Sequence, residues 1–88
     1  MEKNFYVINE LVEPEGDDNY SYIYDKGFTT LEKAKEALNK IRTRIDDDSR
    51  NLNYQYGFRL SEDGQTMIFF FKSGSYETYS IEKVTIEN

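Results

Sequence analysis

The side chains in this chain that could do acid–base chemistry are chiefly its carboxylates, because the 88 residues include no histidine and no cysteine. Their absence removes the usual general base at neutral pH, the thiolate nucleophile and the common structural zinc sites. Two carboxylates can still act as acid and base, but one of them must be buried so that its pKa rises. The acids here stand beside turn residues, where carboxylates are normally solvated, and we therefore predict that the protein is not an enzyme.

The most oxygen-rich segment, Asp46–Asn51, could in principle hold a calcium ion. Counted from Asp46 as a calcium loop, it has Arg50 at position five and Asn51 in place of the glycine at position six. Position twelve is Gly57, where that loop requires a glutamate. The five glycines are isolated, so no phosphate-binding loop is present either. We expect no metal site and no cofactor.

The segment Tyr54–Arg59 has a passing likeness to the aromatic strand of RNA-recognition domains, whose exposed rings stack on bases. That fold needs two helices and a basic surround, whereas this sequence shows one helical pattern and a formal net charge of -6. We therefore do not expect direct binding of nucleic acid.

The negative charge is concentrated near the start of the chain. The first 25 residues contain seven acids and one base, Lys3, and so carry the entire net charge. A negative lobe on a small folded domain favours a basic partner and disfavours nucleic acid or an anionic membrane. The seven acids are Glu2, Glu10, Glu13, Glu15, Asp17, Asp18 and Asp25.

Most of these acids belong to a predicted β-hairpin. Aromatic and β-branched residues from Phe5 to Val12 favour a first strand, which Pro14 and the polar residues after it should end. The second strand covers residues 20–24, where Tyr20, Tyr22 and Tyr24 alternate with other residues and so share one face. We expect residues 10–18 to form an exposed acidic loop between the two strands.

The period then changes to that of an amphipathic helix, from about Thr30 to about Ile45. Thr29 and Glu32 have the spacing of a capping box. Asp46, Asp47 and Asp48 should follow at the C-terminal end, where carboxylates oppose the helix dipole. The predicted buried stripe is Leu31, Ala34, Leu38, Ile41 and Ile45.

Three further strands are predicted after the helix. Residues 54–60 alternate, residues 66–71 are apolar on both faces like a central strand, and residues 76–86 change parity in a way that suggests a bulge near Glu82. The order ββαβββ predicts an α+β fold, with a single helix packed on one face of a largely antiparallel sheet of about five strands. A chain of this length has room for one core, so residues 1–88 should form a single domain.

One helix cannot cover both faces of such a sheet, and we expect several tyrosines on the uncovered face. Either curvature of the sheet or a second copy of the chain could cover that face, and a homodimer is therefore one expectation. The start of the sequence lacks a signal-peptide pattern and no apolar run is long enough for a membrane span, which favours a cytoplasmic protein.

Charge and aromatic placement together favour a binding protein. Carboxylates on a rigid scaffold can stand in for phosphates and tyrosines for bases, so a nucleic-acid mimic is conceivable. In size, acidity and lack of catalytic residues the chain resembles the small inhibitors that phages and mobile elements use against nucleic-acid-binding defence enzymes. The residues expected to contact a basic protein partner are Glu10, Glu13, Glu15, Asp17, Asp18, Tyr20, Tyr22, Tyr24, Asp46, Asp47 and Asp48.

Two alternatives remain open. In the same general features the chain is also similar to immunity proteins and antitoxins that block toxic nucleases. A small accessory or structural domain, homodimeric and acidic only for solubility, explains the composition equally well.

Overall fold

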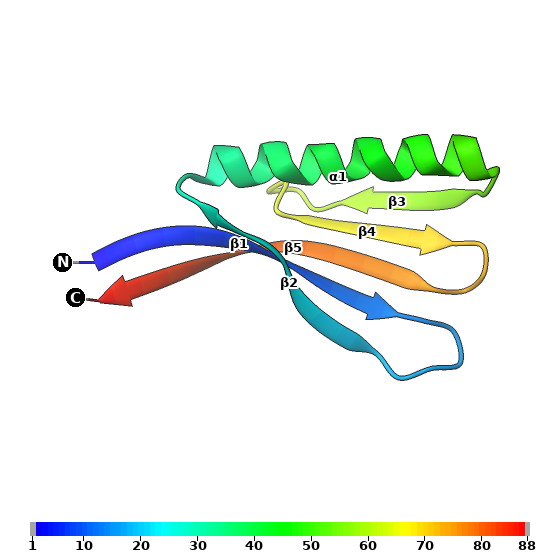
Figure 1. The fold of residues 1–88 in the computed structure, drawn as a ribbon, viewed down its shortest axis with the longest axis horizontal. Helices are drawn as coiled ribbons and strands as arrows, with labels where there is room; N and C mark the ends of the chain where they lie inside the picture. Colours follow the sequence, from blue (N-terminus) through cyan, green and yellow to red (C-terminus); the bar gives the residue numbers. More distant parts are fainter. Residues whose placement is uncertain (1, 88) are drawn as a thin grey trace.

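The computed structural model describes residues 2–87 as one long helix lying against a five-stranded antiparallel sheet (Figure 1). The α+β class and the order ββαβββ predicted from the sequence are confirmed. The elements are β1 (Glu2–Glu13), β2 (Tyr20–Phe28), α1 (Leu31–Leu52), β3 (Tyr56–Leu60), β4 (Thr66–Phe71) and β5 (Tyr76–Glu87).

The strands are arranged in the order β2-β1-β5-β4-β3, so the first and last strands are neighbours near the middle of the sheet. β1 and β5 pair over their whole length in an unbroken register, with Glu2 opposite Glu87 and Glu13 opposite Tyr76. The bulge predicted in β5 is therefore wrong. Tyr79 and Ile81 of β5 have the parity of the helix side. Val84 has the other parity and lies opposite Phe5, on the sheet face that points away from the helix. The register shifts occur between β1 and β2 instead.

The helix begins where the sequence indicates but ends later. Its N-cap is Thr30 and not Thr29, since the Thr30 Oγ1 accepts a hydrogen bond from the Lys33 amide at 3.2 Å. It ends at Leu52, capped by Asn53 in the left-handed conformation with φ 56°. The predicted end at Ile45 is wrong, and Asp46, Asp47 and Asp48 lie within the helix.

Ion pairs explain why the helix tolerates acids near its C-terminal end. The Arg50 guanidinium lies one turn further along and bonds the Asp46 carboxylate at 2.7 Å and the Asp47 carboxylate at 3.0 Å. Pairs at these spacings support a helix by a few tenths of a kcal/mol each. They also place a positive charge in the last turn, where the helix dipole favours one.

The core forms between the helix and the sheet face beneath it. The predicted stripe is confirmed, with Ala34, Leu38, Ile41 and Ile45 buried and Leu31 packed at the margin. From the sheet, the largest fully buried side chains are Tyr79, Phe69 and Ile8. Within the described residues, no helix is both long and apolar enough to cross a membrane.

Most tyrosines lie on the same side of the sheet as the helix. Tyr6, Tyr24 and Tyr56 pack against the core, and Tyr79 belongs to it. The expectation that several tyrosines occupy the uncovered face is therefore wrong, because among the described strands Tyr76 is the one tyrosine whose parity places it on that face. The large apolar side chains exposed on the opposite face are Leu11, Ile23, Tyr76 and Ile86.

Candidate functional site

A hairpin formed by the C-terminal end of β1, the following loop and the start of β2 extends away from the helix, at the lower right of Figure 1. We call Glu13, Glu15, Asp17 and Asp18 the acidic tip. Glu15, Asp17 and Asp18 are exposed, and Glu13 is half-buried. Gly16 adopts φ 82° in this loop, a conformation that a side chain would strain. The predicted acidic hairpin loop therefore exists, although it is shorter than expected.

Two exposed tyrosines accompany the acidic tip. Tyr20 and Tyr22 are 55% and 46% exposed, and their rings stack with centroids 6.3 Å apart and planes inclined by 17°. Tyrosine rings that are already ordered and accessible contribute large contact area at a small cost in conformational entropy. The hairpin thus presents carboxylates and aromatic faces together.

The tip also contacts the turn between β4 and β5. A Cβ atom built on Gly74, whose φ is 96°, would lie only 2.7 Å from the Glu15 Oε2 atom. Only a glycine at position 74 lets the Glu15 carboxylate approach so closely. The end of the hairpin and the neighbouring turn therefore lie side by side.

Glu10 does not belong to the exposed loop. It lies in β1 and is only 4% exposed, so its side chain offers little surface to a partner. Its Oε1 atom accepts a hydrogen bond of 2.5 Å from the Tyr22 hydroxyl. That hydrogen bond, followed by burial and the Glu10 charge, raises the pKa of Tyr22 to about 12. Glu10 therefore orients one of the exposed rings.

A second carboxyl, missed by the sequence reasoning, lies beside Glu10. Glu77 is opposite Val12 in the β1–β5 pairing and so is the diagonal neighbour of Glu10 on the helix side. Burial, and after it the hydrogen bond and negative charge of Glu10, raise the pKa of Glu77. The hydroxyl of Tyr79 donates to the Glu77 Oε1 atom at 3.1 Å. One signal could have revealed the pair: each glutamate has the parity of the buried residues in its strand.

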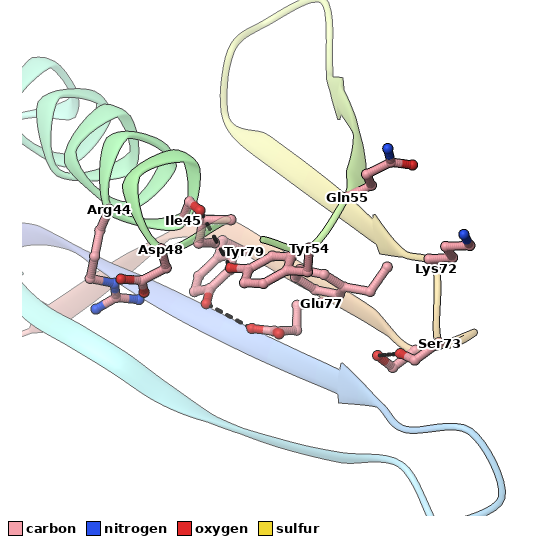
Figure 2. A pocket seen from close by; sticks show the side chains of 11 residues that line it. Arg44, Ile45, Asp48, Tyr54, Gln55, Lys72, Ser73, Glu77 and Tyr79 are labelled. Atoms are coloured by element: carbon pink, nitrogen blue, oxygen red, sulfur yellow. Dashed lines mark hydrogen bonds between the residues drawn. The ribbon is translucent and has the colours of Figure 1, made fainter. Parts of the chain in front are cut away.

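A groove of 460 Å³ lies beside this pair, between the C-terminal half of α1 and the strand β5. We call it the α1–β5 groove. Figure 2 shows the Tyr54 and Tyr79 rings and the Glu77 carboxyl close together, while Lys72 and Gln55 point outward at the other end. Its lining includes Arg44, Asp48, Tyr54, Phe71, Glu77 and Tyr79.

The aromatic walls of the groove are fixed by local contacts. Tyr54 follows the helix cap, and its hydroxyl donates to the Ile45 carbonyl at 3.4 Å. Its ring meets the Phe71 ring edge-on, with centroids 5.9 Å apart. Tyr79 packs edge-on against Phe69 of the core at 5.9 Å. The rings beside the groove are therefore packed against neighbouring aromatic side chains.

Arg44 fills the space above Tyr24. Its guanidinium donates to the Tyr24 hydroxyl and stands 5.4 Å from the centre of that ring. Tyr24 also meets Tyr79 edge-on at 5.4 Å. Tyr24 shares a strand with Tyr20 and Tyr22 as predicted, but it is half-buried and packed against the core.

The three aspartates of the helix are divided between two environments. Asp46 bonds Arg50 and accepts a hydrogen bond of 2.9 Å from the Tyr56 hydroxyl, and Asp47 also bonds Arg50. Asp48 instead lines the α1–β5 groove. Of these three aspartates, only Asp48 lines the same groove as Glu77.

Chemically, the arrangement combines an exposed acidic tip, two accessible rings and a groove with a half-buried carboxyl. Among the side chains described, those of residues 3–86, no three potential metal ligands converge on one point. Such a surface can attract and hold cationic groups of a protein. The chain matches no protein-family model, no curated protein and no solved structure.

Proposed function

We propose that this protein is a non-enzymatic inhibitor that binds a basic, nucleic-acid-handling protein and occupies the surface where that protein holds nucleic acid. The observation that carries the proposal is the acidic tip itself, with Glu15, Asp17 and Asp18 exposed beside the stacked rings of Tyr20 and Tyr22. Phage and mobile-element inhibitors of defence enzymes, and immunity proteins or antitoxins against nucleases, are the functional classes in which we place it.

Charge and rings have separate parts in this proposal. The carboxylates of the tip accelerate the encounter with a positive surface, an effect that salt screens. Tyr20 and Tyr22 then bury aromatic area against the partner, as interface tyrosines commonly do. The contact set is narrower than the sequence indicated, because Glu10 is buried, Tyr24 packs on the core, and Asp46 and Asp47 bond Arg50.

A pull-down from the source cell tests the proposal. The bait is compared with two triple variants of equal charge change. One neutralises the tip by Glu15→Gln, Asp17→Asn and Asp18→Asn, and the control carries Glu32→Gln, Glu36→Gln and Glu62→Gln, which are exposed elsewhere. We expect the parent and the control to retain a basic nucleic-acid-handling protein that the tip variant loses. Added duplex DNA should displace that protein from the parent. Retention by the tip variant at the parental level would contradict the proposal.

The Glu10–Glu77 pair is the feature most suited to catalysis, because one of the two carboxyls has a raised pKa. We nevertheless propose binding, since the buried member of the pair is held by Tyr22 and the exposed acids lie on the tip. Turnover of a nucleotide, glycan or peptide that is abolished by Glu77→Gln would contradict this part of the proposal.

A homodimeric accessory domain is the second candidate function. It is favoured by the exposure of Leu11, Ile23 and Tyr76 on the sheet face without a helix. Sedimentation at micromolar concentration distinguishes the two states. Ile23→Lys should dissociate such a dimer, and a parent that sediments as a 10.5 kDa monomer would exclude it.

A further inference from the structure

We propose that the α1–β5 groove binds one arginine side chain of the partner, with the guanidinium between the Glu77 carboxyl and the ring of Tyr54. This inference deepens the proposed function and rests on it, because it assigns a specific anchor to a partner that the acidic tip only attracts. It concerns a different part of the surface from the tip, and so it can be tested separately.

The shape of the groove favours a planar cation. The rings of Tyr54 and Phe71 line it and meet edge-on, whereas Tyr79 is only 1% exposed and borders the groove through its hydrogen bond to Glu77. A guanidinium stacks on such rings and binds carboxylate oxygens in a fork, whereas an ammonium is a strongly hydrated point charge. The volume of 460 Å³ admits the whole side chain.

The charges of the groove also favour a cation, although both signs are present in its lining. Arg44 is held over Tyr24, and Lys72 points outward at the far end (Figure 2). Asp48 and Glu77 remain as the charges that face the aromatic part, with Glu10 behind Glu77. The charge of Arg44 acts on Glu77 from a distance, but within the described residues neither Asp48 nor Glu77 forms an ion pair.

Entry of a guanidinium should be coupled to ionisation of Glu77. The titratable and charged groups around Glu77 are Glu10 from β1, Tyr22 from β2, Tyr79 from β5, Arg44 and Asp48 from α1, Tyr54 after the helix, and Lys72 from the β4–β5 turn. Burial and Glu10 raise the pKa of Glu77, so the free groove retains the proton to a higher pH than an ordinary glutamate does. A bound cation favours the ionised form and expels that proton to solvent. Affinity should therefore rise as the pH rises through this pKa.

The test uses N-acetyl-arginine amide as the probe, titrated into the full chain at constant ionic strength and followed by amide NMR shifts. We expect shifts centred on Tyr54, Glu77 and Tyr79, and tighter binding at about pH 8 than at about pH 5. Glu77→Gln should weaken binding by about tenfold, the loss of one charge-assisted contact, and should remove its pH dependence. Glu36→Gln, which removes an exposed carboxyl from the helix, should bind as the parent does.

Besides a complete lack of probe binding, three results would overturn the inference. The first is equal shifts with N-acetyl-citrulline amide, the neutral analogue of the probe. The second is equal affinity for N-acetyl-lysine amide, and the third is unchanged affinity in a folded Glu77→Gln variant. The tip variant with Glu15→Gln, Asp17→Asn and Asp18→Asn should bind the probe normally. If the tip variant fails to capture the partner and the parent fails to bind the probe, the proposed function stands and only the groove is rejected.

Discussion

At the level of single residues, Glu10 and Glu77 link the hairpin to the groove. Glu10 is buried in β1 and accepts the hydrogen bond of Tyr22, a ring that the hairpin exposes. Glu77 lies diagonally across from it and accepts the hydrogen bond of Tyr79, a residue of the core. Two carboxyls thus hold two tyrosines, one on the surface and one inside.

The Tyr22 hydroxyl should lose its proton at a higher pH than an ordinary tyrosine does, because of Glu10. The hydrogen bond to Glu10, then burial, and then the repulsion between a phenolate and the Glu10 carboxylate raise the pKa of Tyr22 from 10.0 to about 12. Glu10→Gln removes that charge and should return the pKa of Tyr22 toward 10.0. Tyrosine ring-carbon NMR shifts against pH measure both values. A Tyr22 pKa near 10.0 in the parent would show that the hydrogen bond does not form in solution.

The stability of the protein should fall as the pH rises through the pKa of Glu77. That pKa is raised above its ordinary 4.5, so the folded protein keeps a proton that the unfolded chain has released. The contribution of this group is complete below pH 4.5 and is lost above the raised value. Glu77→Gln, which stays neutral, should become more stable relative to the parent as the pH rises. Thermal unfolding of both proteins across that range measures the difference.

The control is Glu36→Gln, an exposed carboxyl on α1, which should follow the parent at every pH. If the difference in stability between Glu77→Gln and the parent is the same at acid and neutral pH, the pKa of Glu77 is not raised.

At the level of elements, the helix stabilises the sheet through one stripe and is solvated elsewhere. Leu38 and Leu52 lie on the same helix, but Leu38 is 2% exposed and Leu52 is 71% exposed. Leu38→Ala should cost about 2 to 5 kcal/mol of unfolding free energy, since it removes buried methyl groups and leaves a cavity. Leu52→Ala should change it by no more than about 0.5 kcal/mol. Denaturant titrations of the two variants check this, and equal losses would show that the helix does not pack as described.

Sequence pattern was sufficient for the elements whose period is clear. Spacing of the apolar residues located the helix stripe, and alternation located the hairpin tyrosines. The end of the helix was not predictable from propensity, because three consecutive aspartates disfavour a C-terminal turn and only the spacing of Arg50 offsets them. The burial of Glu10 followed from the β1–β5 register, a pairing between the two ends of the sequence that no local pattern reveals.

At the level of the whole molecule, the proposed binding surface has two parts with different roles. The acidic tip carries exposed charge on the protruding hairpin, and the α1–β5 groove offers packed aromatic rings with a half-buried carboxyl. The tip should govern the rate of encounter, and the groove should govern the lifetime of the complex. The helix and the β1–β5 pair hold the two parts in a fixed relation.

The salt dependence of association with the captured partner tests the central claim most directly. As the Debye length falls from about 30 Å to about 10 Å, the association rate of the parent should fall by about tenfold or more. The control with Glu32→Gln, Glu36→Gln and Glu62→Gln should show nearly the same slope. The tip variant with Glu15→Gln, Asp17→Asn and Asp18→Asn should associate slowly at every salt concentration. A tip variant that associates as fast as the parent at low salt would contradict the account.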